Sequence, residues 1–183
     1  YKGDYPAPLP LVPGHEFCGT AVEAGSPEFA CWVGRRATAE INNHCIARNA
    51  SNPCAACRRG MPNHCLERTV MGIIRRDGAF AEEIVVPAHN LHAIPDSLSD
   101  TEAVFVEPVA AALRTFEVMP LEGEARFGSP AGGRPWIAVL GVGRLGLLIA
   151  AVAQALGARV IGLARTERSL ERAAAYCEAL VRA

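Results

Sequence analysis

The sequence predicts an α/β protein, in which an irregular β domain is followed by the start of a parallel α/β domain. Before residue 100, short apolar runs are repeatedly broken by Gly, Pro and Asn, as in a β domain rich in turns. From Trp136 an apolar run leads into a glycine-rich turn, a helical pattern and a second apolar run. A length of 183 residues fits one ordinary domain and part of a second. We expect the domains to cover residues 1–113 and 114–183.

The first domain should contain short strands joined by turns. A helix should follow them over Thr101–Val118, because apolar residues recur there at helical spacing, and Asp100 is a plausible N-cap. The expected strands are Gly19–Glu23, Trp32–Ile41, Phe80–Val86 and Leu91–Ile94.

The second domain should begin as a parallel sheet. Trp136–Leu140 is uniformly apolar, which suits a strand buried on both faces. Gly157 is expected to end the helix that follows this strand. The remaining expectations are a loop over Leu121–Arg134, a helix over Leu145–Leu156, a strand over Arg159–Leu163 and a last helix over Glu167–Val181.

Composition excludes several classes of function. The formal net charge of −1 gives no electrostatic footprint for nucleic acid or an anionic membrane surface. The longest apolar stretch free of charge, Leu145–Leu156, is too short to span a bilayer, which takes about 20 residues. No charged-then-apolar leader is visible, and we expect a cytoplasmic protein.

Four of the seven cysteines lie between residues 45 and 65. Cys54 and Cys57 lie on one tight turn, and Cys65 follows them to give the pattern C-x2-C-x7-C. The fourth candidate ligand is Cys45, which the spacer Ile46–Pro53 separates from Cys54. Four thiolates would close the tetrahedral shell of a zinc ion and leave no position for water, so this zinc would be structural.

Alternatives to the four-cysteine site stay open. The cysteines could be free buried thiols, and His44 or His64 could replace one thiolate. A redox CxxC normally opens a helix after a strand, and Asn52-Pro53 does not resemble such a strand.

His15 and Glu16 form a second candidate site. The pair follows a Pro-Gly turn and offers a neutral nitrogen ligand beside a carboxylate. Alone, such a pair is more often a surface turn, because catalytic sites need several convergent groups.

The glycine-rich turn predicts a nucleotide site. Gly141, Gly143 and Gly146 lie between a buried strand and a helix, where a pyrophosphate would meet the helix N-terminus. The second strand ends at Arg165 with no acid at its tip, which favours NADP over NAD, although Glu167 nearby leaves the choice open. The alternative is a merely structural strand-helix turn.

Together these motifs resemble the zinc-containing alcohol dehydrogenases of the medium-chain dehydrogenase/reductase family. Gly14-His15-Glu16 with Gly19 and Gly25 is similar to the family's GHExxGxxxxxG signature. The resemblance continues through four further segments, which are Cys57–Cys65, Asp77–Glu82, Phe105–Ala112 and Gly141–Gly146.

The resemblance implies a GroES-like catalytic domain, a Rossmann-type cofactor domain, and hydride transfer between an alcohol and NAD(P). Carried over by motif, His15 would bind a catalytic zinc, Glu16 would be a ligand or an inner-shell partner, and Glu107 the later ligand. Glu107 could otherwise be a carboxylate on a helix surface. A Glu at the later position resembles the polyol, sugar and threonine dehydrogenases, which tilts the expected substrate toward a polar secondary alcohol.

The resemblance also implies which residues hold the cofactor and how the subunits assemble. The cofactor pyrophosphate would be held by the glycine-rich turn and the start of its helix, which are Gly141, Gly143, Arg144, Leu145 and Gly146. Arg165 would face the adenosine ribose. We expect a homo-oligomer, with a small alcohol or carbonyl substrate as the other partner.

Three departures from the family pattern are visible. The family's first zinc Cys would precede Tyr1, the Cys45 to Cys54 spacing is longer than its usual C-x2-C, and we expect the cofactor domain to stop after two strands. We therefore expect a fragment lacking both ends and inactive by itself. The rival functions are a non-catalytic zinc-binding scaffold and a zinc-free reductase of the same superfamily.

Overall fold

The computed structural model describes residues 9–119 and 134–183, and it divides into two compact units, residues 1–107 and 108–183. The division falls within a helix that also contains residue 113, where the sequence suggested a boundary. Most of the loop expected over Leu121–Arg134 lies outside the described residues. Among those residues, no helix is both long and apolar enough to cross a bilayer.

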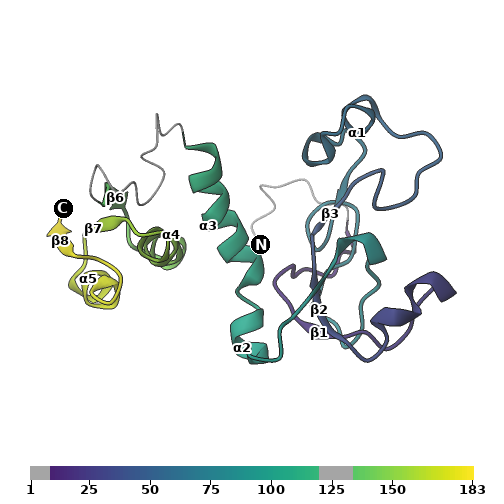
Figure 1. The fold of residues 1–183 in the computed structure, drawn as a ribbon, viewed down its shortest axis with the longest axis horizontal. Coiled ribbons are helices and arrows are strands. Elements are labelled where there is room, and N and C mark those ends of the chain that lie inside the picture. The colour runs from purple at the N-terminus through teal and green to yellow at the C-terminus, as the bar shows by residue number, and fades with distance from the viewer. Residues whose placement is uncertain (1–8, 120–133) are drawn as a thin grey trace. The chain divides into compact units, whose positions relative to one another are not determined.

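The first unit is built from short strands, as its turn-rich sequence predicts (Figure 1). One antiparallel sheet has the order β1-β2-β5, with Gly19 opposite Ala37 and Thr38 opposite His92. A two-stranded sheet pairs β3 with β4. The strands are β1 (Gly19–Thr20), β2 (Arg36–Ala39), β3 (Asn42–Asn43), β4 (Thr69–Val70) and β5 (Leu91–Ala93).

Short helical turns link these strands, and a longer helix follows them. They are η1 (Pro27–Trp32), α1 (Ala55–Arg58), η2 (Pro62–His64), η3 (Ala88–Asn90), α2 (Asp100–Ala103) and α3 (Val106–Val118).

The second unit is a parallel sheet of order β6-β7-β8 (Figure 1). Helices α4 and α5 contact the strands and each other. Val139, Val142, Ala150 and Val160 lie in the core between them. The elements are β6 (Trp136–Leu140), α4 (Arg144–Ala155), β7 (Arg159–Ala164), α5 (Glu167–Ala173) and β8 (Ala179–Arg182).

Two expectations about strands were wrong. Phe80–Val86 forms no strand, and Phe80 instead donates its backbone N–H to the Pro13 carbonyl. The helix expected over Glu167–Val181 ends at Ala173 and is followed by β8, so the described part of the unit has three strands where the sequence suggested two. The apolar residues from Ala173 to Val181 fit either structure, and pairing with β7 selects the strand.

The helix expected over Thr101–Val118 is two helices, α2 and α3. The N-cap is Ser99, one residue before the expected Asp100, because the Ser99 hydroxyl accepts from the Glu102 N–H and the Glu102 carboxylate accepts from the Ser99 N–H. The boundaries of β6 are as predicted, yet Trp136, Ala138 and Leu140 are exposed, so the expected burial of both faces is not seen.

Candidate metal centres and nucleotide site

His15 and Glu16 lie on a segment without regular secondary structure, residues 11–18, that a neighbouring loop holds in place. The Asp77 carboxylate accepts from the Val12 N–H at 2.9 Å, and the Ala79 N–H donates to the Gly14 carbonyl at 2.9 Å. The two segments of the chain pass so closely that a Cβ on Gly78 would lie 2.1 Å from the Gly14 carbonyl oxygen. Only glycine fits this crossing, which fixes the backbone just before His15.

Glu107 joins this segment from the first turn of α3. One ligand atom from each of His15, Glu16 and Glu107 lies within 4.8 Å of the others. Glu107 and His15 are partly buried, and Glu16 is exposed. Burial raises the pKa of the Glu107 carboxyl; His15 opposes this shift and the Glu16 charge adds to it. The structure therefore gathers the three residues that the sequence singled out.

This donor set suits a divalent cation. One imidazole nitrogen and two carboxylates are ligands that zinc accepts, and a cation about 2.1 Å from each donor holds them within about 4.2 Å of one another. The observed 4.8 Å limit is close to that span. A cation would also relieve the repulsion between the two carboxylates.

The four cysteines converge in the same way around a second point. Their sulfur atoms lie within 4.8 Å of one another, with Cys45 3.6 Å and Cys54 3.8 Å from the sulfur of Cys65. A disulfide would require about 2.05 Å, whereas the edge of a tetrahedron with Zn–S bonds of about 2.3 Å is about 3.8 Å. The spacing therefore fits four thiolates around zinc, and the long spacer after Cys45 does not prevent it.

The ionisation of the cysteines also favours a cation. Backbone N–H groups of Cys57 and Leu66 lower the pKa of Cys54 to about 6, so this thiol ionises readily. Burial raises the pKa of Cys57 to about 12, because a buried thiolate is costly without a compensating charge. His44 accepts a hydrogen bond from the Ala47 N–H through Nδ1, and His64 is exposed. Neither histidine belongs to the group of four converging cysteines.

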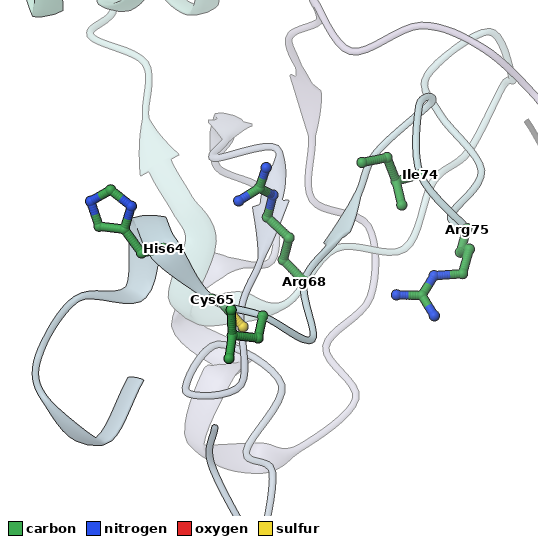
Figure 2. A pocket seen from close by; sticks show the side chains of 6 residues that line it. His64, Cys65, Arg68, Ile74 and Arg75 are labelled. Atoms are coloured by element: carbon green, nitrogen blue, oxygen red, sulfur yellow. The ribbon is translucent and has the colours of Figure 1, made fainter. Parts of the chain in front are cut away.

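A cavity of about 520 Å³ lies beside the cysteine cluster. Figure 2 shows the guanidinium groups of Arg68 and Arg75 apart and pointing in different directions, so they do not converge on one small anion. None of His15, Glu16 and Glu107 lines this cavity. Its lining is His64, Cys65, Leu66, Arg68, Ile74 and Arg75.

The glycine-rich turn lines a separate cavity of about 380 Å³ in the second unit. Gly143 is the N-cap of α4, and a Cβ there would meet no atom within 4 Å. Gly146 is different, since a Cβ there would lie 2.1 Å from the Gly141 oxygen. The turn thus leaves open backbone at Gly143 for a ligand and uses Gly146 for close packing.

Gly141, Gly143 and Arg165 line the cavity, whereas Arg144, Leu145 and Gly146 do not. Sequence reasoning missed Thr166 and Ser169, which also line it and whose hydroxyl oxygens lie 2.9 Å apart. Their position just after the second strand was the available signal, because ligands bind beyond the carboxyl ends of parallel strands.

Comparison with known proteins identifies the family. Residues 1–96 match the alcohol dehydrogenase GroES-like domain. The chain is 36% identical over 155 residues to L-threonine 3-dehydrogenase of Chelativorans sp. (strain BNC1), which covers 84% of this chain and 40% of that enzyme. The chain belongs to the zinc-containing alcohol dehydrogenases. It spans about 40% of the length of the curated relatives that it matches.

Solved structures of dehydrogenases agree with both units. A zinc-binding dehydrogenase of Sinorhizobium meliloti 1021, crystallised with NADP, has a TM-score of 0.81 and 32% identity over 98% of this chain and 48% of that one. Galactitol-1-phosphate dehydrogenase of Escherichia coli has a TM-score of 0.76 and 27% identity over 94% of this chain and 45% of that one. The fold class is therefore a GroES-like domain followed by the start of a Rossmann-type domain.

Proposed function

We propose that the protein carrying this chain is a zinc-dependent dehydrogenase that moves hydride between a polar secondary alcohol and NADP. The observation that carries the proposal is the convergence of His15, Glu16 and Glu107 within 4.8 Å. A scaffold with only a structural metal has no need for this second donor set, and a zinc-free reductase has no need for either.

The two sets of donors have different roles in this proposal. A structural zinc would be held by the four cysteines of the cluster, Cys45, Cys54, Cys57 and Cys65, because four thiolates leave no site for substrate. His15 and Glu107 would hold the catalytic zinc, with Glu16 as a ligand or an inner-shell partner. When bound there, zinc supplies a Lewis acid that makes an alcohol hydroxyl easier to deprotonate.

The chain's own groups would position the reactants. His15 would offer a ring nitrogen, and the carboxylates of Glu16 and Glu107 would balance the cation's charge. The segment of residues 11–18 positions His15 and Glu16, and the first turn of α3 positions Glu107. The backbone N–H groups at the start of α4 would bind the cofactor pyrophosphate. We assign zinc chemistry to residues 1–113 and cofactor binding to residues 114–183.

The preference for NADP rests on the end of β7. Arg165 lines the cavity there together with Thr166 and Ser169, and no carboxylate is among the lining residues described. A guanidinium and two hydroxyls suit a 2′-phosphate, whereas the ribose 2′-hydroxyl of NAD is usually held by an acid.

The preference for a polar secondary alcohol rests on the type of donor set and on the relatives. By its motif Glu107 takes the later ligand position, where a Glu instead of a Cys resembles the polyol, sugar and threonine dehydrogenases. The relatives bear the names of enzymes for L-threonine and galactitol 1-phosphate. We expect the complete protein to be a cytoplasmic homo-oligomer with a small alcohol or carbonyl as its substrate.

Turnover by the complete, zinc-loaded protein tests the proposal. NADPH formation would be followed with L-threonine, a hexitol and a primary alcohol, for the wild type, Glu107→Gln and Glu117→Gln. Glu117 is the matched control, because it lies on the same helix, exposed and paired with Arg114. We expect Glu107→Gln to lower kcat/KM by about 100-fold or more and Glu117→Gln to leave it within about twofold. No turnover by the wild type, or full activity in Glu107→Gln, would refute the proposal.

A further inference from the structure

Strand β2 contacts the two chain segments that lead to the candidate metal ligands His15, Glu16 and Glu107. Arg36 and Thr38 are two positions apart, so their side chains lie on the same face of the strand. Thr38 reaches the segment that carries His15 and Glu16, and Arg36 reaches the start of α2, which precedes α3 and Glu107.

The Thr38 contact is a partly buried hydrogen bond. Its hydroxyl donates to the Phe17 carbonyl at 2.8 Å, and the residue is only 4% exposed. A Val would fill the same volume in a strand, so the shape of the site does not demand a hydroxyl. The hydroxyl is accounted for by its bond to Phe17, because a buried polar group is retained at little cost only where it has a partner.

This bond restrains the part of the segment that follows the stretch held by the Asp77–Phe80 loop. Across residues 9–119 and 134–183, neither His15 nor Glu16 makes a backbone hydrogen bond of its own. Gly14 is held on one side by the Ala79 N–H, and Phe17 is held on the other by Thr38. The two donor residues therefore form a short bridge between two anchored carbonyls.

The Arg36 contact secures the other half of the group. Nε and Nη2 of Arg36 donate to one oxygen of Asp100 at 3.1 and 2.6 Å, and the Cys18 thiol donates to the same oxygen at 3.4 Å. Asp100 is the first residue of α2 and Cys18 lies two residues after Glu16. Because Asp100 is exposed, this contact is expected to be weaker than the partly buried one.

We propose that Thr38 is a positioning residue for the His15–Glu16–Glu107 centre: its hydroxyl fixes the Phe17 carbonyl, so that the His15 and Glu16 ligand atoms stay within reach of Glu107. The proposal rests on the proposed function, since it assumes that these three residues bind the catalytic metal. Thr38 itself touches neither metal nor substrate.

The test compares Thr38→Val, which keeps the shape and loses the donor, with Thr38→Ser, which keeps the donor. Zinc affinity would be measured in the complete protein by competition with a chelator, and the cysteine site of the same molecule serves as an internal control. We expect Thr38→Val to weaken zinc binding at the His15 centre by about tenfold, as loss of a supporting hydrogen bond around a metal does. Zinc binding at the cysteine site should change little even though loss of the bond to the Phe17 carbonyl lowers the thermal midpoint, and Thr38→Ser should stay within about twofold of wild type at both sites.

Steady-state kinetics give a second readout. With zinc in excess, Thr38→Val should lower kcat while KM for NADP stays unchanged, because the nucleotide site lies in the other unit. The proposal would be overturned if Thr38→Val kept the wild-type affinity for zinc, or if it lost affinity equally at both metal sites. It would also be overturned if Thr38→Ser failed to retain zinc binding at the His15 centre. A wild type that binds zinc only at the cysteines would instead refute the proposed function, and this inference with it.

Discussion

His15 and Glu107 come from opposite ends of the first compact unit, and their ligand atoms lie within 4.8 Å of each other. The two elements that carry them differ in kind, since His15 lies on a segment without regular secondary structure and Glu107 on the first turn of α3. Such a meeting of a nitrogen and a carboxylate, with Glu16 beside them, is the arrangement on which the predictions for activity depend.

Removing one cysteine of the cluster should destabilise the first unit. Cys57→Ser leaves three thiolates, and a metal that binds only the folded chain stabilises it in proportion to its affinity. We expect zinc content to fall by one ion per chain and the thermal midpoint to fall by about 10 °C or more. Differential scanning calorimetry and metal analysis would measure both.

Cys31→Ser is the matched control for Cys57→Ser, because Cys31 is an exposed free thiol outside the cluster. It should keep the full zinc content and thermal midpoint. Equal behaviour of the two variants would show that the cluster holds no metal.

Two glycines of one turn should respond to alanine in different ways. A Cβ at Gly143 meets nothing within 4 Å, so Gly143→Ala should leave thermal stability nearly unchanged while it obstructs the approach of a pyrophosphate. A Cβ at Gly146 lies 2.1 Å from the Gly141 oxygen, so Gly146→Ala should lower the free energy of unfolding by about 2 kcal/mol or more. Urea denaturation and NADP titration would separate the two effects, and stability changes of equal size would contradict this account.

Much of this architecture could be predicted from the sequence because local rules and tertiary contacts agree. An apolar run predicts β6, and the glycines that follow it predict the turn. Gly157 then predicts where the next helix ends. The cysteine cluster was also predictable, since thiols with this spacing are typical of a zinc site.

The errors have a different origin. Residues from Ala173 to Val181 are apolar enough for a helix, and only the presence of β7 as a partner makes β8 a strand. Ser99 and Asp100 are both good N-caps, and the choice depends on Glu102, which forms the capping box with Ser99 and leaves Asp100 to bind Arg36. Thr38 could not be found from sequence, because its role depends on a hydrogen bond to Phe17 across two chain segments.

Arg165 should determine which nicotinamide cofactor is preferred. Arg165 lines the cavity at the end of β7, and a charge-assisted bond from its guanidinium to a 2′-phosphate would contribute about 1.5 to 3 kcal/mol. We expect Arg165→Gln to weaken NADP binding by about 10- to 100-fold and to change NAD binding little, as measured by fluorescence titration. Arg168→Gln, an exposed position on α5 that does not line the cavity, is the control. A uniform loss for both cofactors would mean that Arg165 does not read the 2′-phosphate.

The ion pair between Arg36 and Asp100 should make stability depend on acid pH. Hydrogen bonds from Arg36, followed by the Cys18 thiol, hold the pKa of Asp100 below its usual value, which is about 3.9 in an unfolded chain. A carboxyl whose folded pKa is depressed contributes stability that is fully present above the unfolded pKa and is lost as pH falls through the folded pKa. The wild type should therefore exceed Asp100→Asn in free energy of unfolding by a constant amount from about pH 7 to about pH 5, and this difference should shrink below about pH 4.

Chemical denaturation at a series of pH values would measure the difference between wild type and Asp100→Asn. In an Arg36→Gln background the same substitution should have a smaller and flatter effect, because Arg36 is the largest cause of the shift. Glu102, whose pKa is lowered by Ser99, titrates in all of these variants and cancels in the comparison. A difference that widens as pH falls would have the wrong sign for a carboxylate stabilised in its charged form, and it would rule out this ion pair as the origin of the acid sensitivity.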